Sequence, residues 1–169
     1  MIQIQLPHFP EFTKLEINDY KILQAYFDEI QPEISDQNFT NLFLWRDFYD
    51  IRITNLDQNT CLYCASPLTP EKEFFFQPFG DKRILDTIET CLKYLKAQDK
   101  RPIIRRASEK FVKDYLNDQT HLLVQKDKDS SDYVYLAENL IRLQGRRYDG
   151  HRNHIKRFKE NYANSSIEF

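Results

Sequence analysis

Positively charged side chains gather near the C-terminal end of this 169-residue chain, whose formal net charge is −2. We call residues 142–159 the basic segment; its cations are Arg142, Arg146, Arg147, Arg152, Lys156, Arg157 and Lys159. Cations spaced in this way can hold the phosphates of RNA, a lipid head group or a pyrophosphate. The candidate contacts are Arg146, Arg147, Tyr148, Arg152, Asn153 and Lys156. The alternative interpretation is a solvated helix face, which is what most runs of charge form.

Aromatic rings and histidines accompany these cations. Tyr148 and Tyr162 could stack on nucleic-acid bases. His151 and His154 ionise near neutral pH and could act as general bases. However, His154 shares one helical face with Phe158 and Tyr162. This pattern favours a histidine that is packed against apolar side chains over a catalytic one.

The cysteines predict no metal site. Cys61 and Cys64 have C-x-x-C spacing, but the sequence contains no second such pair. Residues three apart in a strand point to opposite faces, so we predict two ordinary half-buried cysteines. The chain has three cysteines, an odd number that is typical of reduced thiols in a cytoplasmic protein. No P-loop, H-E-x-x-H or Ser-His-Asp pattern is visible.

The composition is that of a folded domain. Hydrophobic residues make up 41% of the chain and aromatic residues 14%, which excludes the disordered class. The small net charge argues against a protein that coats nucleic acid, so any phosphate contact must be local. No apolar run approaches about 20 residues, and the N-terminus lacks the pattern of a signal peptide. We therefore expect a cytoplasmic protein without a transmembrane segment.

Hydrophobic periodicity predicts the elements that position these residues. Strands are predicted at 12–17, 51–54, 60–65, 73–77, 102–104, 121–125 and 133–135. Helices are predicted at 19–30, 35–49, 84–95, 108–116, 136–144 and 151–162. Gly145 is expected to end the fifth helix in the left-handed conformation. The helix that contains Trp45 is apolar on nearly all sides, so we predict that it is deeply buried.

Two motifs carry a resemblance to a known family. Residues 145–158 read GRRYDGHRNHIKRF, and residues 39–47 read FTNLFLWRD. Both resemble signatures of a bacterial family of unknown function that is similar to the C-terminal domain of phosphatidylglycerol lysyltransferases. The resemblance implies an α/β fold of the GNAT (acyl-CoA N-acyltransferase) type, a mixed sheet covered by helices. The strand and helix order predicted by periodicity is also that of a GNAT domain.

The resemblance also implies a domain organisation and an activity. Residues 1–135 would form a first GNAT-like domain, and residues 136–169 a basic helical connector to a second such domain outside this chain. Such proteins move an aminoacyl group from aminoacyl-tRNA to an amine or hydroxyl acceptor, and the isolated chain is expected to be inactive. The alternative is a non-catalytic module that docks tRNA or an anionic surface, such as lipid head groups, through the connector.

A GNAT domain binds the pyrophosphate of its acyl-CoA in the turn after its fourth strand, and this turn is degenerate here. The pattern Gln/Arg-x-x-Gly-x-Gly/Ala is met at Gln77 and Gly80, but Lys82 replaces the last small residue. Pro78 removes a backbone N–H donor, and Asp81 adds a negative charge. We therefore expect a helix N-cap rather than a phosphate site. No cofactor is predicted for this domain, although acyl-CoA or aminoacyl-tRNA would serve the full-length protein.

Overall fold

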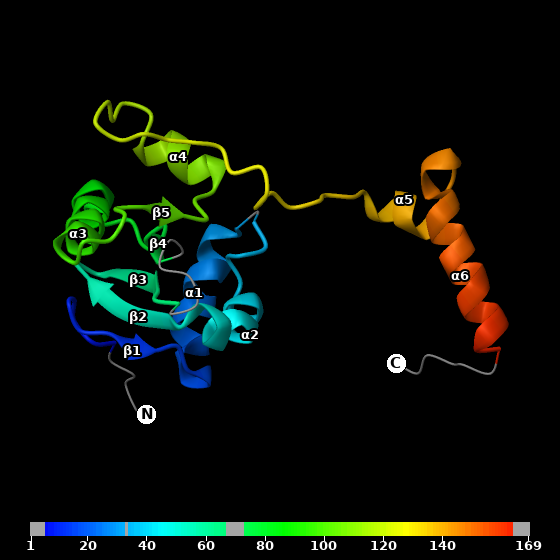
Figure 1. Ribbon diagram of the computed structural model, residues 1–169, viewed down its shortest axis with the longest axis horizontal. Coiled ribbons are helices and arrows are strands. Elements are labelled where there is room, and N and C mark those ends of the chain that lie inside the picture. Colours follow the sequence, from blue (N-terminus) through cyan, green and yellow to red (C-terminus); the bar gives the residue numbers. More distant parts are fainter. Residues whose placement is uncertain (1–5, 33, 67–72, 164–169) are drawn as a thin grey trace. The chain divides into compact units, whose positions relative to one another are not determined.

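The computed structural model describes residues 6–32, 34–66 and 73–163. It contains two compact units, Met1–Ser130 and Ser131–Phe169 (Figure 1). We call them the sheet unit and the helical unit. Residues 164–169 of the predicted connector lie outside the described residues.

The sheet unit is built on five strands in the order β1-β2-β3-β4-β5 (Figure 1). They are β1 Thr13–Lys14, β2 Ile51–Leu56, β3 Asn59–Cys64, β4 Phe74–Phe76 and β5 Ile104–Arg105. The first three pairings are antiparallel, and β4 pairs with β5 in parallel. The structure confirms a mixed α/β fold with the predicted element order as far as residue 116. The first strand is shorter than predicted, because only two residues pair with β2.

A tight turn joins β2 to β3 in an antiparallel hairpin, where strands were predicted at 51–54 and 60–65. Asp57 and Gln58 both have positive φ, 52° and 70°, and Leu56 pairs with Asn59 across the turn. Two consecutive residues with positive φ form the turn that matches the right-handed twist of the flanking strands.

Two helices cover one face of the sheet. These are α1 (Tyr20–Ile30) and α2 (Phe39–Tyr49), which follows a short 3-10 turn, η1 (Ile17–Asp19), and α1. Asn38 caps α2, because its side chain accepts a hydrogen bond of 2.8 Å from the backbone N–H of Asn41. The core of this layer joins apolar side chains from both helices and three strands: Leu23, Phe27, Phe39, Leu42, Ile51, Ile53, Leu62, Cys64, Phe74 and Phe76.

The opposite face packs against α3 (Ile84–Ala97) and α4 (Glu109–Tyr115). Cys61 and Phe75 pack here with Cys91 and Leu95 of α3. Cys61 and Cys64 therefore lie on opposite faces, as predicted, but both are fully buried rather than half-buried. Burial raises the pKa of the Cys64 thiol, so it behaves as a small apolar side chain.

The helix α2 corrects one prediction. It buries Phe39 and Leu42, but Leu44, Trp45 and Phe48 are 71%, 50% and 45% exposed. A single-layer contact with the sheet covers only one side of a helix, whatever the composition of the other sides. The predicted deep burial of Trp45 is wrong.

The predicted strands at 121–125 and 133–135 do not form. Neither segment has a strand residue in the structure, and Tyr133 and Val134 are each 88% exposed. Aromatic and branched residues favour strands only where a neighbouring strand or a buried face is available. The exposed residues Tyr133 and Val134 have neither a neighbouring strand nor a buried face.

The helical unit contains α5 (Ala137–Arg142), a 3-10 turn η3 (Arg146–Tyr148) and α6 (Asp149–Asn161). The helix α5 ends earlier than predicted, because Leu143 and not Gly145 takes the left-handed conformation, with φ of 47°. Gly145 also has positive φ, 89°, but it precedes η3 and leads the chain into α6.

Candidate functional site

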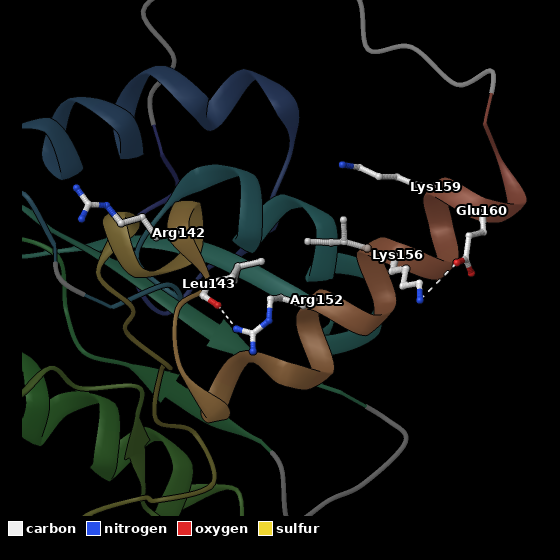
Figure 2. Close-up of a pocket in the computed structure, with 7 residues that line it drawn as sticks. Arg142, Leu143, Arg152, Lys156, Lys159 and Glu160 are labelled. Carbon is white, nitrogen blue, oxygen red and sulfur yellow. Dashed lines mark hydrogen bonds and ion pairs between the residues drawn. The ribbon is translucent and has the colours of Figure 1, made fainter.

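A basic hollow lies between α5 and α6 (Figure 2). Its volume is about 480 Å³, and it is lined by Arg142, Leu143, Arg152, Ile155, Lys156, Lys159 and Glu160. Four of these seven residues are cations and one is an anion. Leu143 and Ile155 are its apolar lining residues. The hollow therefore combines net positive charge with apolar area, which suits an amphipathic anion.

Arg152 is committed to the protein itself. Its guanidinium donates to the carbonyl oxygens of Leu143 and of Gly145, the latter at 3.1 Å, and pairs with Asp149. These bonds tie the α5–α6 connection to the first turn of α6 (Figure 2 shows the bond to Leu143). Arg152 was predicted to contact a ligand, but in the structure its guanidinium binds groups of the protein itself.

The other cations differ in their partners. Arg142 pairs with Glu138 at 2.8 Å, and Lys156 lies 3.8 Å from Glu160. Among the residues that the structure describes, no carboxylate forms an ion pair with Arg146, Arg147, Arg157 or Lys159. An exposed cation without a carboxylate partner keeps its full charge available for an external anion.

Tyr148 is not placed for base stacking. It is 5% exposed, its ring meets that of His151 edge-on at 5.7 Å, and the Arg147 guanidinium lies 4.7 Å from its centre. Asn153 is exposed on α6, as is His154, so the predicted packing of His154 is wrong. Leu143 and Ile155 line the hollow but were not predicted to do so, although Arg152, Ile155 and Lys159 are spaced along one side of a helix.

The turn between β4 and α3 has a different construction from a phosphate cradle. The buried side chain of Gln77 accepts a hydrogen bond of 2.8 Å from the backbone N–H of Ser108, the residue that caps α4. Phe79 is buried and pairs with Thr60 of β3. Gln77 therefore bridges the chain after β4 to the start of α4.

Gly80 is required by a close approach to Asn59. A Cβ at Gly80 would lie 2.1 Å from the Asn59 side-chain oxygen, and φ of Gly80 is 153°. The fully buried Asn59 accepts from the N–H of Lys82 at 3.3 Å and donates to its carbonyl at 2.5 Å and to Thr87 at 2.8 Å. A protein side chain thus uses the backbone donor that a bound anion would need.

The charges around this turn also disfavour an anion. Asp86 lies in the first turn of α3, Asp81 precedes it, and Arg83 is paired with Asp86 at 2.7 Å. The helix α3 begins after Arg83, which takes a left-handed conformation and forms no side-chain cap. These carboxylates already place negative charge at the positive end of the α3 dipole, where an anion would otherwise be attracted.

A buried polar network that the sequence did not reveal lies on β3. The Tyr63 hydroxyl donates to Glu73, Lys100 donates to the Tyr63 oxygen at 2.8 Å, and Lys100 and Glu73 form an ion pair. Burial, followed by the hydrogen bond to Glu73, raises the pKa of Tyr63 to about 12. Burial opposes the charge on Lys100, but its bonds to Glu73 and Tyr63 outweigh burial and raise its pKa.

The comparison with family models decides the affiliation. A model described as the C-terminal region of phosphatidylglycerol lysyltransferase matches residues 27–168. The chain belongs to this family. The match covers both motifs that carried the resemblance, the segment at 39–47 and the one at 145–158, and confirms it.

A solved structure has the same fold. It is a conserved protein of unknown function from Bacteroides thetaiotaomicron, which is 20% identical and superposes with a TM-score of 0.71. The match covers 95% of this chain and 52% of the other, so the chain spans about half the length of that protein. No curated protein matches the chain.

The described part of the chain contains no cluster of three or more His, Cys, Asp or Glu side chains that could hold a metal ion. None of its helices combines the length and the apolar character that crossing a membrane requires.

Proposed function

We propose that this chain is the first half of a tandem GNAT-like protein that transfers an aminoacyl group from aminoacyl-tRNA to an amine or hydroxyl acceptor, in the cytoplasm. The observation that carries the proposal is the family match over residues 27–168. The sheet supports the GNAT part of it. A GNAT domain would have three antiparallel strand pairings followed by one parallel pair. The sheet has this arrangement, and α3 connects the two parallel strands.

The chemistry of the reaction assigns different tasks to the two halves. Acyl transfer needs the donor ester beside the acceptor and hydrogen-bond donors for the oxyanion that develops. In the sheet unit, the turn at 77–82 directs its polar groups to Asn59 and Ser108. The second half would therefore carry the reaction centre, and this half would contribute binding of the RNA.

The RNA-binding role falls to Arg146 and Arg147. Both are exposed on η3, and neither has a carboxylate partner among the residues that the structure describes. Each phosphate that they neutralise releases a counterion, so binding should weaken as salt rises. Arg142 and Arg152 differ from these two arginines, because each of them already pairs with a carboxylate of the protein.

The activity is tested on the natural gene product that contains this sequence. tRNA charged with labelled amino acids is incubated with it and with lipids and soluble amines, and the label that leaves the RNA is identified. We expect acyl products from a two-half protein and none from the 169-residue chain. Release at the rate of spontaneous hydrolysis would contradict the transfer, and a stop codon directly after Phe169 would contradict the tandem arrangement.

The RNA contact is tested with the chain itself. Replacing Arg146 and Arg147 with Ala should flatten the log–log dependence of tRNA affinity on salt by about 1 to 1.5. The control replaces Lys110 and Lys113, which pair with Asp114 and Glu109 on α4, and it should change the slope little. Equal losses in the two double variants would contradict a specific contact.

A further inference from the structure

Two hydrogen-bond donors are buried without a partner in the sheet unit. They are the side-chain Nε2 of Gln37, a residue that is only 2% exposed, and the Nε of Arg105. In the part of the chain that the structure describes, no other buried side-chain nitrogen or oxygen lacks a hydrogen bond. A buried polar group without a partner costs free energy, so such a pair of donors points to something that binds there.

Arg105 lies at the carboxyl end of β5. The strands β4 and β5 are the parallel pair at one edge of the sheet (Figure 1). The Arg105 side chain lies on the face that α1 and α2 cover, because its guanidinium is 5.8 Å from the ring of Phe74, a core residue of that layer. The carboxyl ends of parallel strands are the usual place for ligand sites in open α/β sheets.

An ion pair brings the segment of Gln37 to the same end of β5. The guanidinium of Arg106 lies 2.7 Å from the carboxylate of Asp36, although the two residues are 70 positions apart. Their side chains are 24% and 21% exposed. Arg106 takes a left-handed conformation with φ of 58°, which a non-glycine residue adopts at a cost. The α1–α2 connection is thus held at the end of β5, and Gln37 and Arg105 each adjoin one member of the pair.

The carboxylates nearby are engaged elsewhere. Asp36 pairs with Arg106, and Asp127 accepts a hydrogen bond of 3.0 Å from Ser130. That hydrogen bond is the main cause that lowers the pKa of Asp127, and the charge of Arg105 adds to the lowering. Among the described residues, no carboxylate lies within ion-pair distance of Arg105. The guanidinium therefore keeps its charge and its Nε–H for a ligand.

We propose that the end of β5 and the α1–α2 connection bind the carboxylate group of a small organic acid. The Nε–H and one Nη–H of an arginine are parallel, and together they match the two oxygens of a carboxylate. The Gln37 amide donates a further hydrogen bond to one of these oxygens. The Phe74 ring beside Arg105 contacts the carbon atoms of the acid. The acid is small, because Gln37 is almost inaccessible to solvent.

Other occupants fit these donors less well. A water molecule would bond to both donors but would leave the positive charge of Arg105 without an anion in a half-buried position. Phosphate is tetrahedral, and its binding generally uses several cations or a set of backbone N–H groups. The carboxylate site is independent of the proposed aminoacyl transfer, since it involves neither the RNA nor the connector.

Thermal unfolding of the 169-residue chain in sodium acetate tests the proposal. Sodium chloride and sodium phosphate at the same ionic strength and pH 7 are the references. We expect a saturable rise of the midpoint with acetate, because a ligand that binds the folded state stabilises it, and no such rise with chloride.

A matched pair of variants tests the role of Arg105. Arg105→Lys keeps the charge but removes the parallel N–H groups, and it should weaken the apparent affinity for acetate about tenfold. Arg101→Lys makes the same change at an exposed arginine four positions earlier, and it should leave the affinity unchanged.

Gln37→Glu tests whether the two donors share one site. The new carboxylate has nearly the shape of the amide and would accept from Arg105 itself. The variant should therefore keep its midpoint and lose the response to acetate. A carboxylate buried away from any cation would instead lower the midpoint strongly. That result would place Gln37 and Arg105 in separate surroundings and overturn the shared site.

Three further results would overturn the carboxylate site. They are the lack of a saturable rise with acetate, equal affinities in Arg105→Lys and Arg101→Lys, and a rise with phosphate as large as that with acetate. If Arg105→Lys does not fold, Gln37→Leu decides, because it removes the other donor without adding charge. It should lower the acetate affinity about tenfold, and an unchanged affinity would contradict the proposal. No tRNA is present in these assays, so their failure leaves the transfer activity to its own test.

Discussion

At the scale of single residues, buried polar side chains decide what the sheet unit can do. The Asn59 side chain donates hydrogen bonds outside its own hairpin, to Lys82 and Thr87, which are 23 and 28 positions further along the chain. Its amide satisfies backbone groups at the start of α3, where a GNAT domain would hold a pyrophosphate. The glycine that fits the cofactor motif is thus explained by the protein's own packing.

Gly80→Ala should destabilise the sheet unit by about 2–3 kcal/mol, since the new Cβ meets the Asn59 side chain and the backbone is strained. Urea unfolding followed by circular dichroism measures the loss. Asn59→Ala should itself cost about 1–3 kcal/mol, because the Lys82 backbone and the buried Thr87 hydroxyl lose their partner. In the Asn59→Ala background, the cost of Gly80→Ala should fall; an unchanged cost would show that the two residues do not interact.

The Tyr63 network predicts a specific pH dependence. The folded pKa of Tyr63 is about 12, above the ordinary value of 10, so the folded state holds this proton more tightly than the unfolded state does. The resulting stability is complete below pH 10 and is lost as the pH rises from 10 to 12. The raised pKa of Lys100 acts in the same direction.

Tyr63→Phe should therefore lower stability at pH 7 by about 1–2 kcal/mol and flatten its fall above pH 10. Urea unfolding at neutral and alkaline pH measures both effects. Tyr133, which is 88% exposed, provides the control: Tyr133→Phe should leave the alkaline fall unchanged. If Tyr63→Phe and Tyr133→Phe give the same dependence of stability on pH, the folded state does not hold the Tyr63 hydroxyl proton more tightly than the unfolded state.

At the scale of elements, α2 shows how composition and burial differ. Phe39 and Leu42 face the sheet core, whereas Leu44, Trp45 and Phe48 face away from it. Trp45 contacts Phe48 and Tyr49, with ring centres 5.8 and 6.1 Å apart. The exposed side is therefore an aromatic surface cluster rather than part of the core.

Two leucines on α2 test this assignment. Leu42 is 3% exposed, and Leu42→Ala should cost about 2–5 kcal/mol. Leu44 is 71% exposed, and Leu44→Ala should change stability by less than about 0.5 kcal/mol. Thermal or urea unfolding measures both, and iodide should quench the single tryptophan, Trp45, in the folded protein. Equal costs at the two leucines, or a shielded tryptophan, would contradict the exposed side.

The β4–α3 turn gives a ligand prediction at the same scale. Because Asn59 uses the Lys82 N–H and Asp86 lies in the first turn of α3, acetyl-CoA should not stabilise the chain. A ligand at a hundred times its dissociation constant would add about 2.7 kcal/mol. Melting curves over a range of acetyl-CoA concentrations make the comparison. A saturable rise in the midpoint that disappears in Asn59→Asp would reveal a phosphate site after all.

At the scale of the whole molecule, the chain is two units joined by exposed backbone. Residues 131–136 have no regular secondary structure, and Tyr133, Val134 and Tyr135 are 88%, 88% and 54% exposed. Segments of this kind are the usual sites of proteolytic cleavage. The boundary of the sheet unit at Ser130 precedes all three.

Limited digestion with chymotrypsin should cut first after Tyr133 or Tyr135. The remaining sheet unit should keep its circular dichroism spectrum and its unfolding midpoint, because its core clusters contain no residue beyond Leu122. Mass spectrometry locates the cut. First cleavage inside 74–116, or unfolding of the product, would contradict two separately folded units.

Elements whose signals are local could be predicted from the sequence. The helices predicted at 84–95 and 108–116 need only neighbouring residues, and both formed as α3 and α4. The family motifs were also readable from the sequence. The tertiary structure alone decided the exposed side of α2, the missing strand at 121–125, the bridge from Asn59 and the internal tie of Arg152. Each of these depends on which distant segment lies opposite, and spacing along the chain carries no record of that.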